Sequence, residues 1–339
     1  MRLVFVTQQV DPADPNLGAT VSKIRALAGR VDELAVVADR AVEGVLPANC
    51  RIHLFASAHR VGRGARFERA LLRELARRPL PDAVIAHMCP IYAVLAAPLA
   101  RPLGVRVVLW FTHWRRSRLL AAAERASNVV LTVDRRTFPL DSRKVRAIGH
   151  GIDLGGLACE ERPARNPLTL LALGRTSPAK GLETVVKGVA LVPGVRLVVR
   201  GPSVTEEERV HRAALEHLVR VLDVGDRVQI AEPVPRHEVP AVLRSADALV
   251  NNMHAGATDK VVYEAAATCL PVLASNPAFD TLLPEELRFA RESPESLAEA
   301  IRRLEVVDLR AVGRALRENV ESRHSVEGWA DAVVEAARR

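Results

Sequence analysis

The sequence has few cysteines and few aromatic residues. The cysteines, Cys50, Cys89, Cys159 and Cys269, are scattered and form no C-x-x-C pair. This spacing disfavours a zinc site and is typical of reduced thiols in a cytoplasmic protein. Aromatic residues make up only 4% of the chain. Without zinc-finger spacing or an aromatic-rich strand motif, we do not expect a nucleic-acid partner.

Long apolar runs are also missing. The most apolar stretch, residues 90–100, is too short to cross a bilayer. The N-terminus opens on a predicted strand and lacks the long apolar core of a signal peptide. The expected location is therefore the cytoplasm.

Several motifs that bind cofactors or metals do not occur. No G-x-G-x-x-G follows a predicted strand, which disfavours a dinucleotide cofactor. Leu182 follows Lys180 and Gly181, so the magnesium-ligating hydroxyl of a P-loop is not in place. No G-x-S-x-G elbow and no D-x-D metal pair is found. We therefore expect no metal and no bound cofactor.

The composition that remains is that of a globular protein. The chain has 339 residues, of which 49% are hydrophobic and 26% charged. This length suggests two domains of ordinary size. The net charge of +8 favours anionic partners, either polyanions or small molecules.

Strand and helix patterns alternate along the chain. Apolar runs predict strands at 2–7, 33–38, 51–55, 82–86, 105–111, 128–132 and 144–148, and then at 168–174, 195–201, 227–230, 247–251 and 271–275. Helical spacing predicts helices at 18–29, 63–78, 90–103 and 116–126, and a helical end from about 293. Glycines, a proline and charges predict a linker over 149–166. We expect an α/β protein with two doubly wound domains, 1–150 and 151–324, and a cleft between them.

The stretch 246–275 reads as strand, polar loop, helix and strand. Its loop would lie at the carboxyl end of a strand, where open parallel sheets bind ligands. Glu264 lies mid-helix beside small residues. A buried carboxylate must accept hydrogen bonds, and the diol of a ribose would supply two. A solvated glutamate on an amphipathic helix is the open alternative.

A second strand–loop–helix pattern covers residues 171–192. Gly174 permits a turn, Arg175 and Lys180 frame the loop, and Gly181 lets the backbone approach a ligand. Two cations beside a helix N-terminus form a diphosphate site. The alternative is an ordinary turn with solvated basic residues. Gly201 repeats the strand-then-glycine geometry after the next strand.

The first half offers three further candidates. His113 follows a buried strand, where an imidazole could donate to a sugar hydroxyl or a phosphate; a core histidine is the alternative. Gly18 would open a helix start to a phosphate, or it belongs to a polar loop. His150 lies at the domain junction and either faces the cleft or holds the linker.

The segment 61–78 predicts a basic amphipathic helix. Apolar residues form one side and arginines crowd the rest. Such a helix could lie on an anionic membrane surface, giving peripheral membrane association. A solvated helix face is the alternative.

Four motifs together resemble the family 4 glycosyltransferases, which have the GT-B fold of two Rossmann-like domains facing a central cleft. They are GRTSPAKG at 174–181, VVRGP at 198–202, ADALVNN at 246–252 and DKVVYEAAATCLPVLAS at 259–275. The resemblance covers nearly the whole chain. It implies that the first domain meets the acceptor and the second binds the donor. The final helix, 325–339, is expected to cross back to the first domain.

The resemblance also implies roles for individual residues. Arg175 and Lys180 would bind the donor diphosphate, and Glu264 the ribose. Gly18 would lie near the phosphate, and His113 near the donor sugar and the reaction centre. These roles describe a nucleotide-sugar site that stabilises its leaving group with protein cations.

One segment departs from the family pattern. The family usually has a second glutamate where this chain has Gly256. The small-residue loop that contacts the donor sugar is replaced by Ala257, Thr258, Asp259 and Lys260. Backbone N–H groups of these residues can serve instead, and Asp259 or Lys260 could take over polar contacts. The donor base and sugar are therefore left open.

The predicted function is transfer of a sugar, a hexose by the resemblance, from a nucleotide-diphosphate sugar to an acceptor hydroxyl. The resemblance implies retention of configuration and a role in glycan, cell-envelope or glycosylated-metabolite biosynthesis. The acceptor is unknown, and the basic helix is compatible with a lipid-linked or anionic one. Two alternatives are open: a GT-B protein that binds sugar nucleotides without turnover, and a GT-B sugar-nucleotide epimerase.

Overall fold

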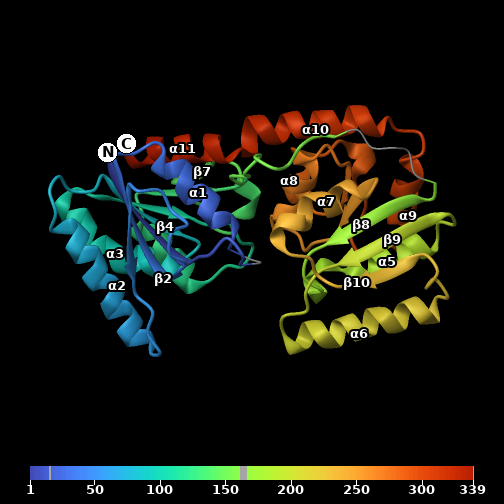
Figure 1. Ribbon diagram of the computed structural model, residues 1–339, viewed down its shortest axis with the longest axis horizontal. Coiled ribbons are helices and arrows are strands. Elements are labelled where there is room, and N and C mark those ends of the chain that lie inside the picture. Colours follow the sequence, from blue (N-terminus) through green and yellow to red (C-terminus); the bar gives the residue numbers. More distant parts are fainter. Residues whose placement is uncertain (15–16, 161–165, 339) are drawn as a thin grey trace. The chain divides into compact units, whose positions relative to one another are not determined.

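The computed structural model describes residues 1–14, 17–160 and 166–338. The chain divides into two compact units, Met1–Asp153 with Arg323–Arg339, and Leu154–Ser322. Each unit is built on one parallel sheet with helices packed against it (Figure 1). The α/β class and the two Rossmann-like folds predicted from the alternating pattern are confirmed.

The first unit contains a seven-stranded sheet in the order β3-β2-β1-β4-β5-β6-β7. Its strands are β1 (Arg2–Val10), β2 (Glu33–Ala41), β3 (Cys50–Leu54), β4 (Ala83–His87), β5 (Arg106–Trp110), β6 (Val129–Thr132) and β7 (Val145–Ala147). Each predicted strand of this half is present, with ends that shift by a few residues. Central strands such as β4 are buried along their whole length, because helices cover both faces of a parallel sheet. The strand order reverses between β1 and β4, which marks the ligand-binding edge of such a sheet.

Five α-helices are described in the first unit: α1 (Ala19–Ala28), α2 (Arg60–Leu75), α3 (Pro90–Ala100), α4 (Arg118–Ala126) and α11 (Val326–Arg338). The helix predicted at 63–78 starts and ends three residues earlier than expected. Phe67 of α2 packs against Phe55 and against Tyr92 of α3, and ring centroids in this group lie 4.6–6.1 Å apart. Helix α11, the end of the chain, packs on α1. These contacts fix the helices on the sheet.

The second unit contains a five-stranded sheet in the order β10-β9-β8-β11-β12. The strands are β8 (Leu168–Leu173), β9 (Val195–Arg200), β10 (Val228–Ala231), β11 (Ala248–Asn251) and β12 (Val272–Ala274), as predicted. The α-helices are α5 (Leu182–Ala190), α6 (Glu206–Val221), α7 (Val239–Arg244), α8 (Lys260–Ala267), α9 (Pro294–Arg303) and α10 (Leu309–His324). The order reverses between β8 and β11. The loops that follow these two strands therefore meet at one edge of the sheet.

The prediction of reduced thiols is wrong for Cys159 and Cys269, which form a disulfide with Cα atoms 5.1 Å apart. Their separation of 110 residues hides the pair from any rule based on local cysteine spacing. The fold brings the two together, because Arg317 of α10 donates to the carbonyl oxygens of both Leu157 and Ala267. The start of the second unit thus lies beside the end of α8.

Cys50 and Cys89 in the first unit are free thiols, as expected. Burial raises the pKa of Cys50 to about 11 and that of Cys89 to about 12. Both side chains are therefore protonated at neutral pH, and neither supplies a thiolate nucleophile. Among the residues described, no helix is both long enough and apolar enough to cross a membrane.

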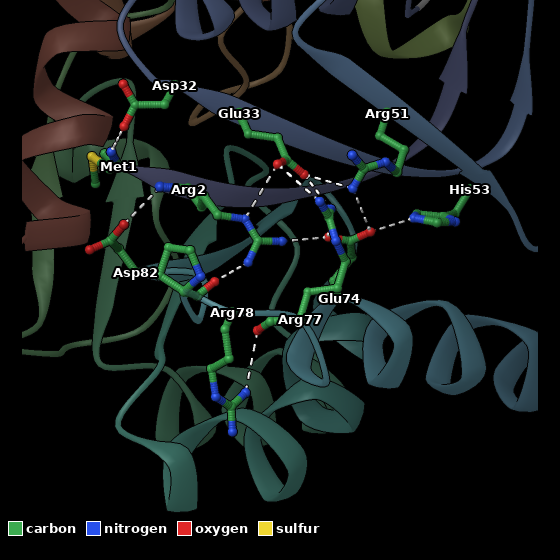
Figure 2. A network of polar contacts seen from close by, with 11 residues as sticks. Met1, Arg2, Asp32, Glu33, Arg51, His53, Glu74, Arg77, Arg78 and Asp82 are labelled. Atoms are coloured by element: carbon green, nitrogen blue, oxygen red, sulfur yellow. Dashed lines mark hydrogen bonds and ion pairs between the residues drawn. The ribbon is translucent and has the colours of Figure 1, made fainter.

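A buried carboxylate, Glu74 of α2, organises the amino-terminal edge of the first sheet (Figure 2). Its side chain is 1% exposed. Arg2 and Arg77 donate to Oε2 at 2.9 and 3.1 Å, and His53 Nε2 lies 2.7 Å from Oε1. Arg51 approaches the same oxygen to 3.7 Å. We call these five residues the Glu74 network; it ties α2 to the start of β1 and to β3.

Replacement of Glu74 by glutamine is expected to destabilise the first unit. The amide keeps the shape of the side chain but removes the negative charge that faces Arg2, whose side chain is only 9% exposed. Glu33, 3.7 Å away, is then the acidic partner of Arg2, and we expect a cost of about 3 kcal/mol. Urea unfolding followed by tryptophan fluorescence measures this loss, because Trp110, Trp114 and Trp329 all lie in this unit. Glu68→Gln on the same helix, outside the network, is the control. Equal midpoints for the two variants would contradict the role given to Glu74.

Candidate functional site

The ends of β8 and β9 approach so closely that only glycines fit between them. Gly174 and Gly201 have φ of +123° and +155°. A Cβ on Gly201 would lie 2.0 Å from the carbonyl oxygen of Gly174. The backbone N–H of Thr176 donates to Pro202 O at 3.1 Å. The two predicted glycines therefore join the β8 and β9 loops at the carboxyl edge of the sheet.

Lys180 is held at the end of β8 by two acceptors. Its Nζ donates to Leu173 O at 3.0 Å and to Asp259 Oδ2 at 2.5 Å. Asn251, the last residue of β11, donates to the same Asp259 oxygen at 2.8 Å. The Lys180 and Asp259 side chains are only 13% and 16% exposed. A Cβ on Gly174 would lie 2.3 Å from Nζ, so this ammonium rests directly on the backbone.

Arg175 has a different partner. Its guanidinium lies 3.4 Å from Glu208 Oε1, and its side chain is 45% exposed. Glu208 belongs to the capping box of α6, in which the Thr205 hydroxyl accepts from the Glu208 N–H. Oε2 of Glu208 also accepts from Val204 N at 2.7 Å. The two cations predicted to frame one site thus lie on the same loop and face different carboxylates.

The loop after β11 is fixed by asparagines. Asn276 donates to His254 O and Ala257 O at 2.8 and 2.7 Å and accepts from Gly256 N at 3.1 Å. Gly256 has φ of +79°, which explains its glycine without a ligand. The N–H of Ala257 donates to His254 O at 3.2 Å. In this structure the N–H of Ala257 is therefore used within its own loop, and its role toward a donor sugar stays a prediction.

Asn252 attaches that loop to the Lys180 loop. Its Nδ2 donates to Gly181 O at 2.9 Å, and its Oδ1 accepts from Ser275 Oγ at 2.6 Å. A Cβ on Gly181 would lie 2.5 Å from Asn252 Nδ2. A small hollow here is lined by residues from β8, β11 and the start of α5, including Gly174, Lys180, Asn251 and Asn252.

Glu264 is buried on α8, and the alternative of a solvated glutamate is excluded. Only 2% of the residue is exposed. Arg236 binds both carboxylate oxygens, Oε2 at 3.0 Å and Oε1 through a shorter contact. Lys260 Nζ lies 3.6 Å from Oε1. Burial lowers the pKa of Lys260, while Glu264 acts in the opposite direction.

The sequence motifs gave no sign of Arg236. It begins a 3₁₀ turn, Arg236–Glu238, ahead of α7. No helical or strand spacing links it to Glu264, which is 28 residues away. Glu208 and Asn276 were missed for the same reason: each acts through a tertiary contact. Only the T-x-x-E capping box at 205–208 was visible, and it predicts a helix start rather than a partner for Arg175.

His113 lies in the loop after β5 in the first unit. The N–H of Arg115 donates to His113 Nδ1 at 3.0 Å. The ring stacks on Trp114 with centroids 5.5 Å apart. Burial, and to a smaller extent Arg115, lowers the pKa of His113. With Nδ1 accepting, the neutral ring carries its proton on Nε2 and can donate it.

His150 lies where the end of the chain meets the linker. Its N–H donates to His324 Nδ1 at 3.2 Å, and burial lowers the pKa of His324 to about 4. Gly149 and Gly151 have positive φ, and a Cβ on Gly149 would lie 1.9 Å from Arg323 O. His150 is 8% exposed. This backbone contact fits the alternative in which His150 holds the linker in place.

Gly18 is required by its own loop. A Cβ there would lie 2.7 Å from Asp14 O and 2.8 Å from Pro12 O. Its N–H donates to Asp14 O at 3.0 Å. The polar-loop alternative thus accounts for the glycine, which still stands at the start of α1.

Thr258, which also belongs to the predicted donor loop, directly precedes Asp259, the N-cap residue of α8. The second unit therefore brings together Gly174, Lys180, Gly201, Asp259, Lys260 and Glu264 at one edge of its sheet, whereas Gly18, His113 and His150 belong to the first unit. Within the described ranges, no group of three or more His, Cys, Asp or Glu side chains could hold a metal ion.

Two Rossmann-like units, one with a lysine and a buried glutamate at the switch point of its sheet, define the class of GT-B glycosyltransferases. Three comparisons agree with this class. Residues 160–319 match the family model of "Glycosyl transferases group 1". Sucrose-phosphate synthase from Thermosynechococcus elongatus superposes with a TM-score of 0.80 at 19% identity, over 99% of this chain and 98% of that one. Anabaena Alr3699/HepE in complex with UDP-glucose superposes with a TM-score of 0.76 at 15% identity, over 99% of both chains.

A D-inositol 3-phosphate glycosyltransferase from Mycobacteroides abscessus is 33% identical over 104 residues, which is 30% of this chain and 23% of that protein. The chain therefore matches only about a quarter of the length of this relative. The fold of the chain is GT-B, and its second unit belongs to the group 1 glycosyltransferase family. The resemblance noted in the sequence is confirmed at this level.

His113 is expected to be neutral at pH 7, with its proton on Nε2. The Arg115 N–H donates to Nδ1, and burial disfavours the charged ring, so its pKa should lie below 6.5. Nitrogen-15 NMR of the histidine side chains, with His113→Gln to assign the signal, measures both properties. A ring protonated on Nδ1 at pH 7 would contradict this geometry.

Proposed function

We propose that the chain is a retaining glycosyltransferase of family 4 type, which moves a hexose from a nucleotide-diphosphate sugar to an acceptor hydroxyl. The observation that carries the proposal is Lys180, held at the switch point of a group 1 glycosyltransferase domain. The second unit would bind the donor and the first the acceptor. One solved structure of this fold is titled as a complex with UDP-glucose, which supports a nucleotide sugar as donor.

The donor would be held by charge and by hydrogen bonds. Lys180 and Arg175 would bind the diphosphate, and Glu264 would accept from the ribose hydroxyls. Arg236 does not block this role, because each carboxylate oxygen has two lone pairs and the guanidinium occupies one. It keeps the carboxylate oriented inside the unit.

The chemistry needs charge stabilisation more than a protein base. Cations beside the departing diphosphate stabilise the charge that develops in the transition state. The leaving phosphate itself can accept the proton of the acceptor hydroxyl, and His113 Nε2 would donate to the sugar. No metal and no further cofactor enters this proposal. Release of the nucleoside diphosphate would distinguish turnover from binding alone.

The acceptor belongs to the same proposal. A relative that matches part of the chain is named for an inositol phosphate, and the chain carries a net charge of +8. An anionic or lipid-linked acceptor fits that charge, with the chain in the cytoplasm. Glycan, cell-envelope or metabolite glycosylation are the pathways in which such an acceptor is used.

Helix α2 is the surface that would meet a membrane. Val61 is 86% exposed and Leu72 50%. Val61 and Leu72 are 11 residues apart, about three helical turns, and Arg69 precedes Leu72 by three residues, so the three share one side of the helix. Apolar side chains among arginines are typical of helices that lie on anionic bilayers.

Lys180→Ala is expected to lower kcat/KM for donor hydrolysis or transfer about 100-fold, because it removes a cation from the developing charge. Lys187→Ala is the matched control, since this lysine is exposed on the following helix, α5. The assay measures nucleoside diphosphate released from a panel of sugar nucleotides. Unchanged turnover in the Lys180 variant would remove the basis of the proposed function.

Arg69→Glu with Arg73→Glu is expected to abolish co-sedimentation with vesicles rich in phosphatidylserine, since each basic side chain near an anionic surface contributes about 1 kcal/mol. Arg310→Glu with Arg314→Glu, at the same spacing on α10, is the control. If the wild-type protein does not co-sediment with these vesicles, the proposed membrane contact is refuted. The transferase proposal is not affected by that result.

A further inference from the structure

The ammonium of Lys180 is already occupied. It has three hydrogens to donate, and two are directed at Leu173 O and Asp259 Oδ2 at 3.0 and 2.5 Å. Gly174 lies directly beneath it, so Nζ cannot retreat toward the sheet. A diphosphate that reaches Lys180 must therefore share this cation with Asp259 or displace the carboxylate.

The Asp259 carboxylate is directed away from its own helix. Asp259 is the N-cap residue of α8, where aspartate usually accepts from the N–H groups of the first turn. Here the side chain makes no such bond. It accepts instead from Lys180 and, at 2.8 Å, from Asn251. The Asp259 side chain therefore does not cap its own helix and serves instead as the counter-ion of Lys180.

Other acidic groups near the site are held by a guanidinium or by the start of a helix. Glu264 is bound through both oxygens by Arg236 and faces Lys260. Glu208 accepts from backbone N–H groups at the start of α6. Asp259 lacks such bonds to a guanidinium or to a helix start. Asp259 is therefore the carboxylate at this edge that can release its cation to an anionic ligand.

We propose that Asp259 is an internal competitor for Lys180: it neutralises the ammonium while the site is empty, weakens nucleoside diphosphate binding, and helps to expel that product. This inference rests on the proposed function, in which Lys180 binds the diphosphate. It replaces the role expected from the sequence, in which Asp259 contacts the sugar. The diphosphate and the Asp259 carboxylate would bind the Lys180 ammonium in turn.

Asp259→Asn tests the proposal because the amide keeps the shape of the side chain and removes its charge. The probe is whichever of UDP, GDP and ADP the wild-type chain binds most tightly by titration calorimetry. We expect the Kd of that nucleotide to fall about tenfold, since a like charge beside the phosphates is lost and the cation is released. Asp226→Asn, just before β10 at the opposite edge of the sheet, is the control and should leave the Kd unchanged.

The double variant Lys180→Ala with Asp259→Asn separates competition from simple repulsion. If Asp259 acts by occupying Lys180, its replacement should tighten binding much less once Lys180 is absent. An equal or larger gain in that background would overturn the proposal, and so would weaker or unchanged binding by Asp259→Asn alone. Thermal melting of each variant confirms folding. Failure of the wild-type chain to bind any of the three nucleotides would instead refute the proposed function.

Discussion

The contact between Lys180 and Asp259 determines how the candidate site can work. A charge that is mostly removed from water must be neutralised by a partner, and here the partner comes from the protein itself. The same rule pairs Arg175 with Glu208 and Glu264 with Arg236. Each of these three charged pairs is thus neutralised without a ligand. Binding an anion becomes an exchange of partners, and its affinity reflects the difference between two sets of contacts.

The groups that take part in this exchange are positioned by close contacts between backbone segments. Gly174 and Gly201 let the β8 and β9 loops touch, and Gly181 lets Asn252 reach across from the loop after β11. As a result, the loops that follow β8 and β11 contact each other, and the order of the sheet reverses between these two strands. A side chain at Gly174 would push Lys180 away from the end of β8, and one at Gly181 or Gly201 would collide with Asn252 or with the backbone of Gly174. The position of the cation is therefore set by missing Cβ atoms as much as by its carboxylate partner.

Much of the fold follows from the sequence, because apolar runs and helical spacing are local signals. The strands of both sheets were predicted this way, and Glu264 was singled out because a mid-helix carboxylate among alanines needs partners. Its actual partner, Arg236, lies outside any local pattern. The disulfide between Cys159 and Cys269 and the Asn276 contacts are also tertiary, so spacing rules could not find them. Gly18 was predicted to lie near a phosphate or in a polar loop, and Gly256 near the donor sugar. Close contacts with backbone oxygens account for glycine at the first position, and a positive φ accounts for it at the second.

In the first unit the ion-pair network and the loop proposed to meet a ligand lie at opposite edges of one sheet. The Glu74 network includes Arg2, the first residue of β1, and Arg51, the second residue of β3 (Figure 2). The carboxyl-terminal edge holds the loop with His113, whose Nδ1 is used by the backbone and whose Nε2–H is available. Because a parallel sheet collects its ligand loops at the carboxyl edge, a dense set of ion pairs at the other edge stabilises the unit without competing for a substrate. In the second unit the ion pairs lie at the binding edge itself, and this difference is what makes an internal competitor possible there.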